Sequence, residues 1–157
     1  MSSYIRVFEE QHSYFITVVT EQRRAILLDN IDLLRRSFYY SKKRYAYTID
    51  AIVILPDHFH MIITPKNHND YPKIISHIKR SFVYGLNKEF KKKIFWEQSL
   101  TSRKRKLAGV WQKRFYEHTL RHEKDFNLHL AYIQNNPVKH GYIGEDGVWE
   151  YSSFFKY

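Results

Sequence analysis

Cysteine is absent from this chain of 157 residues, so disulfide bonds, a cysteine nucleophile and a cysteine-ligated zinc site are excluded. Glycine is scarce, with five residues, and no phosphate-cradling glycine loop of the Walker type occurs. We therefore expect no nucleotide cofactor. The longest purely apolar run, residues 51–55, is far too short to span a bilayer, and the N-terminal residues contain no apolar signal core. These absences predict a soluble protein of the cytoplasm.

Acidic residues are also fewer than basic ones. Sixteen Asp and Glu stand against 26 Lys and Arg, which gives a formal net charge of +10. Such an excess favours a polyanionic partner such as nucleic acid. Aromatic residues make up 17% of the chain and can serve both as core and as platforms for stacked bases. The length suits one domain, and because neither an internal repeat nor a Pro/Gly/Ser-rich linker divides the chain, we predict a single domain over residues 1–157.

Hydrophobic periodicity predicts a mixed arrangement of strands and helices. The expected strands are 13–20, 46–55, 58–64 and 110–119, and the expected helices are 31–44, 71–91 and 125–136. The second and third strands are joined by a short turn that contains proline, which favours antiparallel pairing. The order strand, helix, strand, strand, helix, strand is the split βαβ arrangement of ferredoxin-like folds. We therefore expect an α+β fold, in which helices pack on an antiparallel sheet.

Two histidines two residues apart are the first candidate site. His58 and His60 begin the strand at 58–64, directly after the turn. Side chains two apart on a strand point to the same face, about 7 Å apart at their Cα atoms, so both imidazoles can converge on one metal ion. For an isolated His-x-His, two half-buried structural histidines are the commoner explanation. The motif needs support from elsewhere in the chain.

A second segment supplies that support. Residues 125–136 have the spacing of an amphipathic helix, with Asp125 as the expected N-cap and Pro137 as the expected stop. Tyr132 and Asn136 are four residues apart and therefore share one helix face. A phenol can act as a covalent nucleophile, and an amide oxygen is a hard ligand for Mg²⁺ or Mn²⁺. The alternative is a packed tyrosine followed by a helix-stopping asparagine.

Other residues offer rival chemistry. Tyr116 is the alternative nucleophile, although it lies in an expected strand with no metal-type partner four residues on. His118 and His122 are four apart, but Thr119 stands where a zinc-protease helix requires glutamate, so we interpret them as half-exposed polar histidines. His140 can contact a phosphate or carry a proton, or can be a plain surface residue.

A run of four basic residues lies in the stretch 98–109. Its members are Arg103, Lys104, Arg105 and Lys106. Such a run can be a solvated loop held extended by charge repulsion, or it can contact backbone phosphates. We count it, together with Lys139 and His140, among the candidate DNA contacts.

The two long motifs LPDHFHMI at 55–62 and RFYEHTLRHEKDFNLHLAYIQNNPVKHGY at 114–142 resemble those of the REP-associated tyrosine transposases. This group is related to the single-tyrosine HUH transposases of small insertion sequences. Weaker similarity, in YFITVVTEQRRAILL at 14–28 and WEYSSF at 149–154, extends the resemblance over nearly the whole chain.

The resemblance implies an HUH endonuclease fold and assigns roles to four residues. His58, His60 and Asn136 would hold a divalent ion, Mg²⁺ or Mn²⁺, and Tyr132 would attack a phosphodiester of single-stranded DNA. Insertion-sequence relatives usually have glutamine at the third ligand position, whereas Asn136 matches the REP-associated branch.

The implied reaction leaves a 5′-phosphotyrosine and a free 3′-OH, which makes the protein a nickase and strand transferase for transposition-like recombination of palindromic hairpin DNA. The branch implies a monomer, with a dimer as the alternative. A noncatalytic nucleic-acid-binding domain and a phosphodiesterase that uses water are the competing functions.

Overall fold

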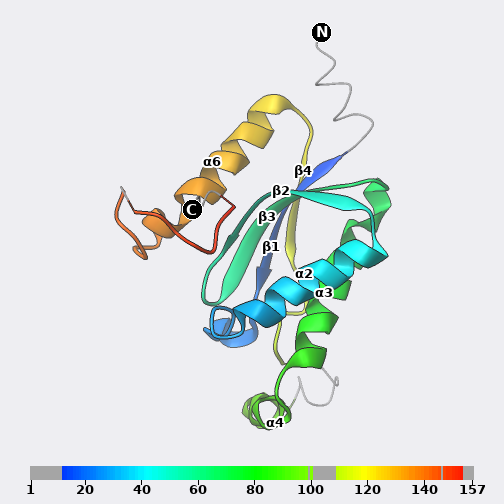
Figure 1. The fold of residues 1–157 in the computed structure, drawn as a ribbon, viewed down its shortest axis with the longest axis vertical. Helices are drawn as coiled ribbons and strands as arrows, with labels where there is room; N and C mark the ends of the chain where they lie inside the picture. The colour runs from blue at the N-terminus through cyan, green and yellow to red at the C-terminus, as the bar shows by residue number, and fades with distance from the viewer. Residues whose placement is uncertain (1–11, 99, 101–108, 146, 154–157) are drawn as a thin grey trace.

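The computed structural model describes residues 12–98, 100, 109–145 and 147–153. Four strands form one antiparallel sheet in the order β2-β3-β1-β4 (Figure 1). The strands are β1 Ser13–Val19, β2 Tyr47–Ile54, β3 His58–Pro65 and β4 Tyr116–Leu120, and the α-helices are α2 Ile31–Arg44, α3 Tyr71–Gly85, α4 Lys88–Glu97 and α6 Glu123–Lys139. Short 3-10 turns, η1 Glu21–Arg23 and η2 His68–Asp70, complete the described elements. The predicted α+β fold with a split βαβ order is confirmed.

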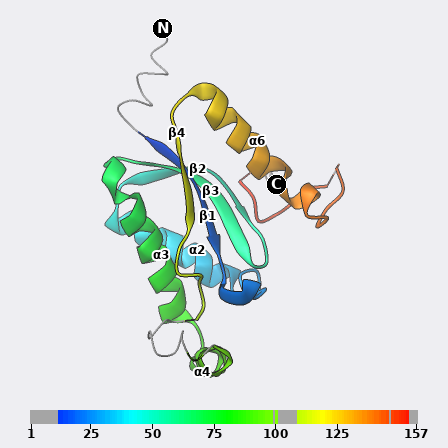
Figure 2. The same cartoon turned by 180° about the vertical axis from the view of Figure 1, so that it is seen from behind.

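The sheet is covered on both faces, with α2 and α3 on one side and α6 on the other (Figures 1 and 2). Strand β1 contributes side chains to both hydrophobic cores, one on each face of the sheet. Ile16 and Val18 join the larger core with α2 and α3, while Phe15 joins a smaller core with Ile133 of α6. Because both faces are covered, β1 carries apolar side chains on both sides rather than on one alone.

Strand β3 follows the same alternation and thereby aims the two histidines. Phe59 and Met61 point into the larger core, and Ile62 belongs to the smaller core under α6. His58 and His60 have the parity of Ile62, so their side chains lie on the face that α6 covers. The fold therefore brings the histidine motif and the tyrosine-bearing helix to one face of the sheet.

The helix predicted over 71–91 is wrong in its extent, because the structure has two helices there. Helix α3 ends at Gly85, and Leu86 has an extended backbone. Helix α4 then begins with Asn87 as its N-cap, whose side chain accepts hydrogen bonds from the backbone N–H groups of Glu89 and Phe90. The asparagine side chain takes the place of backbone carbonyls as hydrogen-bond acceptor and so starts a new helix. This local preference outweighs the hydrophobic pattern, which continues without a break from α3 into α4.

The strand predicted over 110–119 is shorter than expected. The paired ladder covers only Tyr116–Leu120, and Trp111 makes an isolated bridge with Thr20. The Trp111 ring packs against Phe59 and Phe82 in the larger core, and its indole N–H donates to the Lys79 carbonyl at 3.2 Å. The residues before Tyr116 thus anchor the chain to the core instead of extending the sheet edge.

Helix α6 differs from its predicted bounds at both ends. His122, not Asp125, is the N-cap, and its ring accepts a hydrogen bond from the Asp125 backbone N–H. Pro137 stands inside the helix, which continues to Lys139 and is closed by a hydrogen bond from the His140 N–H to the Asn136 carbonyl. A proline this near the end interrupts little of the hydrogen-bond ladder. None of the helices described is long and apolar enough to cross a membrane.

Candidate metal and tyrosine site

His58 and His60 face each other at the start of β3. Their ring centroids are 4.8 Å apart and the rings are nearly perpendicular. Each residue is only 5% exposed, so both imidazoles lie inside the protein. The arrangement requires a partner for every ring nitrogen, because a buried polar atom without one is unfavourable.

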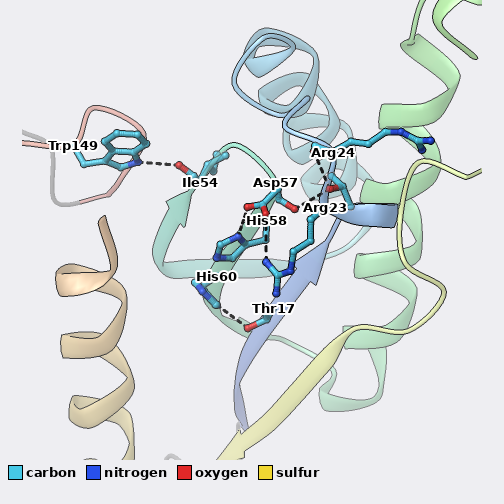
Figure 3. A network of polar contacts seen from close by, with 9 residues as sticks. Thr17, Arg23, Arg24, Ile54, Asp57, His58, His60 and Trp149 are labelled. Atoms are coloured by element: carbon cyan, nitrogen blue, oxygen red, sulfur yellow. Dashed lines mark hydrogen bonds and ion pairs between the residues drawn. The ribbon is translucent and has the colours of Figure 1, made fainter. Parts of the chain in front are cut away.

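One nitrogen of each ring is held by a neighbouring side chain (Figure 3). His58 Nδ1 lies 2.6 Å from a carboxylate oxygen of Asp57, and His60 Nδ1 lies 2.7 Å from the Thr17 hydroxyl. The Asp57 carboxylate can only accept, so His58 Nδ1 carries the proton and Nε2 keeps its lone pair. A carboxylate behind an imidazole is the usual means of orienting a histidine toward a metal ion.

Asp57 is itself fixed by the turn that follows β1. Arg23 donates to its second carboxylate oxygen at 3.3 Å (Figure 3). The Asp57 carbonyl accepts the Thr20 N–H at 2.9 Å. Arg23 has a positive φ of 51°, an uncommon conformation for a residue with a side chain. This ordered turn holds the carboxylate that orients His58.

The electrostatics keep both histidines neutral. Burial lowers the pKa of His58 and outweighs the hydrogen bond that His58 donates to Asp57, which acts in the opposite direction. Burial is the main cause that lowers the pKa of His60 to about 3, and electrostatic repulsion between a protonated His60 and His58, His140 and Lys139 adds to it. Although burial alone would raise the pKa of Asp57, its hydrogen bond with His58 and its ion pair with Arg23 hold that pKa below its ordinary value. Neutral imidazole is the form that binds metal ions.

Helix α6 supplies the remaining members of the site. The Tyr132 ring lies 5.2 Å from the His60 ring, and the His140 ring lies 5.5 Å from the His58 ring, centroid to centroid. Asn136 is one turn after Tyr132 and one turn before His140, so it belongs to the helix face that meets the two strand histidines. We refer to His58, His60 and Asn136 as the β3–α6 site.

Three buried polar atoms of the β3–α6 site have no hydrogen-bond partner among the described residues. They are His60 Nε2 and both amide atoms of Asn136, a residue that is fully buried. Leaving such a group unpaired costs about 1–3 kcal/mol each, so a ligand that binds them is strongly favoured. Two imidazole nitrogens and an amide oxygen are donors that suit a divalent metal ion.

A pocket of about 500 Å³ opens beside this site. Phe15, Thr17, His60, Tyr116, His129 and Tyr132 are among the residues that line it. Tyr132 is 38% exposed there, whereas Tyr116, on the edge strand β4, is 58% exposed. The pocket therefore gives a ligand direct access to the Tyr132 phenol next to the histidines.

Comparison with known proteins places the whole chain. The family model described as "Transposase IS200 like" matches residues 9–136. The REP-associated tyrosine transposase of Escherichia coli K12 is 32% identical over 99% of this chain and 84% of its own length. A Haemophilus influenzae Rd protein assigned to the same group is 37% identical over 99% of this chain and 87% of its own length. This chain belongs to the REP-associated tyrosine transposase family.

A solved structure of a REP-associated tyrosine transposase bound to a REP hairpin has a similar fold. It superimposes with a TM-score of 0.71 and 30% sequence identity, over 91% of this chain and 76% of the other. The resemblance stated from the sequence motifs is thus confirmed. Tyrosine transposases cleave DNA and transfer strands, so the family makes this protein an enzyme.

Two of the candidate DNA contacts predicted for this transposase are among the described residues. Lys139 and His140 are exposed at the end of α6, and Lys139 Nζ lies 5.2 Å from the centroid of the Tyr132 ring. Both residues therefore lie beside the β3–α6 site, and their contact with DNA stays a prediction. Arg103, Lys104, Arg105 and Lys106 fall outside the described residues, so their proposed phosphate contacts stay a prediction.

Sequence reasoning missed a second histidine cluster in this transposase. His118 of β4 is half-exposed as predicted, but its Nε2 lies 2.7 Å from a carboxylate oxygen of Asp125. His129, one turn after Asp125 on α6, has its Nδ1 3.2 Å from the other carboxylate oxygen. We call these three residues the β4–α6 cluster. The spacing of Asp125 and His129 was the available signal, whereas the contribution of His118 depends on the pairing of distant elements.

Proposed function

We propose that this protein is a metal-dependent endonuclease and strand transferase that acts on single-stranded hairpin DNA through a 5′-phosphotyrosine intermediate on Tyr132. The observation that carries the proposal is the meeting of Tyr132 with His60. The phenol is accessible from the pocket, and its ring lies 5.2 Å from an imidazole whose Nε2 is buried without a partner. A nucleophile and a metal-ligand set thus share one wall of the pocket.

His58, His60 and Asn136 would hold the divalent ion, which we take to be Mg²⁺ or Mn²⁺. Such an ion supplies Lewis acidity toward a non-bridging phosphate oxygen. Because the donors are neutral, none of them cancels the positive charge that this chemistry needs. Asp57 and Thr17 orient the two imidazoles through their Nδ1 atoms.

Tyr132 carries out the bond exchange in this mechanism. Its phenol oxygen attacks the phosphorus, the bond from phosphorus to the 3′ oxygen breaks, and the phenol proton leaves as the 3′-OH is formed. The phenol must give up its proton during the attack. Lys139, whose ammonium lies over the Tyr132 ring, favours the negative charge that develops on the phenol oxygen.

The partner we propose is a DNA strand that folds into a hairpin. A structurally similar relative was solved bound to a REP hairpin, and the net charge of +10 suits a phosphate backbone. Phe15 and Tyr116 line the pocket beside Tyr132 and offer aromatic faces to unpaired bases. Lys139 and His140 stand at the same opening, where a backbone phosphate would approach, and we propose that a monomer carries the complete site.

Replacing Tyr132 with phenylalanine tests the proposal. Tyr132→Phe keeps the ring but removes the only oxygen that can form the adduct. We expect this variant to fold, to bind hairpin DNA and to bind the metal ion, yet to produce neither nicks nor a protein–DNA adduct. The assay is denaturing electrophoresis of a single-stranded hairpin substrate labelled downstream of the cut, with Mn²⁺ and with chelator.

Tyr116→Phe is the matched control, because Tyr116 opens onto the same pocket and its ring packs edge-on against Phe15, with the ring centroids 6.2 Å apart. This variant is expected to nick and to form the adduct. An adduct that persists in Tyr132→Phe and disappears in Tyr116→Phe would reverse the nucleophile assignment. Nicking by the unmodified protein without an adduct under rapid quenching would identify water as the nucleophile.

A further inference from the structure

The β4–α6 cluster gathers three metal-ligating side chains outside the β3–α6 site. His118, Asp125 and His129 each offer a ligand atom, and these atoms all lie within 4.8 Å of one another. The ligands come from two elements, since His118 is in β4 while Asp125 and His129 lie in the first two turns of α6. The Asp125 side chain is 19% exposed and the His129 side chain is 23% exposed, so the cluster is partly shielded from water.

We propose that the β4–α6 cluster is a second metal site, which binds an ion of the zinc class and joins β4 to the start of α6. Two imidazoles and one carboxylate are a recognised zinc donor set, with a fourth position left for water. The carboxylate makes this donor set different from the neutral one of the β3–α6 site. The two sites should therefore differ in their preferred metal ions.

The geometry brings the donor atoms together before an ion binds. Asp125 receives His118 Nε2 at 2.7 Å on one carboxylate oxygen and lies 3.2 Å from His129 Nδ1 on the other. His129 Nδ1 is also 2.8 Å from the Asp125 backbone carbonyl oxygen. The two imidazole rings stack with their centroids 4.8 Å apart and an interplanar angle of 21°. An ion would replace protons shared between these atoms, so binding would weaken at acidic pH.

The β4–α6 cluster lies close to Tyr132, the proposed nucleophile. His129 stands three residues before Tyr132 on α6 and lines the same pocket. The His129 ring also packs against Phe15, which in turn contacts the Tyr132 ring. An ion held between β4 and α6 would fix the start of the helix that carries Tyr132 and Asn136. The second ion would thus be a positioning element for the first site.

A cobalt titration tests this site separately from the first. The double variant His58→Ala/His60→Ala removes two donors of the β3–α6 site and leaves the β4–α6 cluster intact. We expect it to bind one equivalent of Co²⁺, with visible absorption bands of a four- or five-coordinate ion that Zn²⁺ displaces. Adding His118→Ala or His129→Ala should weaken Co²⁺ binding at least tenfold and remove these bands.

His68→Ala, in the same double variant, is the matched control because His68 is an exposed histidine outside both clusters. It should leave the Co²⁺ affinity unchanged. Should the multiple variants fail to fold, the unmodified chain provides the measurement: two equivalents of metal ion are expected, and one in His118→Ala. Absence of Co²⁺ bands in the double variant, or equal affinity with and without His118 and His129, would overturn the proposal.

Discussion

The β3–α6 site and the β4–α6 cluster both join histidines of one strand to polar side chains of the same helix. They differ in how their polar atoms are satisfied. In the β4–α6 cluster the Asp125 carboxylate lies within 3.2 Å of a nitrogen of each imidazole. In the β3–α6 site, His60 Nε2 and the Asn136 amide are buried with no partner among the described residues. The β4–α6 cluster can thus hold together by itself, whereas the β3–α6 site needs a ligand.

This difference separates two uses of the same residue types. Buried polar atoms without a hydrogen-bond partner destabilise a protein and persist where they serve a function. A carboxylate shared by two imidazoles contributes to packing even without an ion. We therefore expect changes at the β3–α6 site to slow nicking far more than they lower stability. Changes at the β4–α6 cluster should slow nicking less and should lower stability.

Between the two clusters, the largest expected effect follows from removing an imidazole of the β3–α6 site. His58→Ala or His60→Ala should lower the rate of Mn²⁺-dependent nicking more than about 100-fold, because loss of a ligand should exceed the 10–100-fold typical of losing a group that only orients one. Affinity for hairpin DNA should change little, since phosphate and base contacts supply binding. Single-turnover nicking and filter binding measure the two quantities.

His118→Ala provides the contrast for this prediction, with a loss of nicking smaller than tenfold. His68→Ala, a change at an exposed residue outside both clusters, should nick at the unmodified rate. Equal losses in His58→Ala and His118→Ala would remove the distinction between the two clusters. Unimpaired nicking by His58→Ala or His60→Ala would dismiss the β3–α6 site as a metal centre.

The same contrast explains what the sequence could predict. The β3–α6 site depends on periodicities within single elements: two residues along a strand for His58 and His60, and four along a helix for Tyr132 and Asn136. Such spacings do not change when the bounds of an element are wrong by a few residues. The wrong N-cap at Asp125 and the wrong helix end at Pro137 therefore did not affect the prediction of the site. The split βαβ order could be predicted for the same reason, because the order of the elements does not depend on their exact bounds.

The β4–α6 cluster could not be predicted in this way. His118 meets Asp125 only because β4 pairs with the edge of β1 and α6 turns back over that face, and both facts depend on tertiary packing. The break at Asn87 was missed for a different reason. A single capping side chain there overrides a periodic pattern that continues through Leu86 into the next helix.

A smaller effect concerns pH and sharpens the description of the β3–α6 site. The pKa values of His58 and His60 are lowered in the folded protein, so the unfolded chain binds more protons below pH 6.5 and stability falls with acidification. For His60 the loss continues toward pH 3, with a slope of up to about 1.4 kcal/mol per pH unit. Asp57 contributes in a lower window, since its lowered pKa costs stability only below about pH 4.

Urea unfolding in chelator at pH 7, 6 and 5 measures this dependence. His60→Gln should reduce the slope by about the share of one histidine, while His58 and His77, whose pKa values are also lowered, keep the remainder. An unchanged slope in His60→Gln would mean that His60 is accessible to protons in the folded protein.

The smallest effect tests the unpaired amide directly. Asn136→Leu replaces a buried amide, unpaired among the described residues, with an apolar side chain of similar size. In chelator we expect the free energy of unfolding to rise by about 1 kcal/mol, because an unsatisfied polar group is removed. Asp125→Leu should lower it by about 1 kcal/mol, since that carboxylate interacts with both imidazoles and with the start of α6. Asn136→Leu should also nick more slowly, so stability and activity move in opposite directions at this position. A loss of stability in Asn136→Leu would show that the amide is paired in the folded protein, and the β3–α6 site would then resemble the β4–α6 cluster.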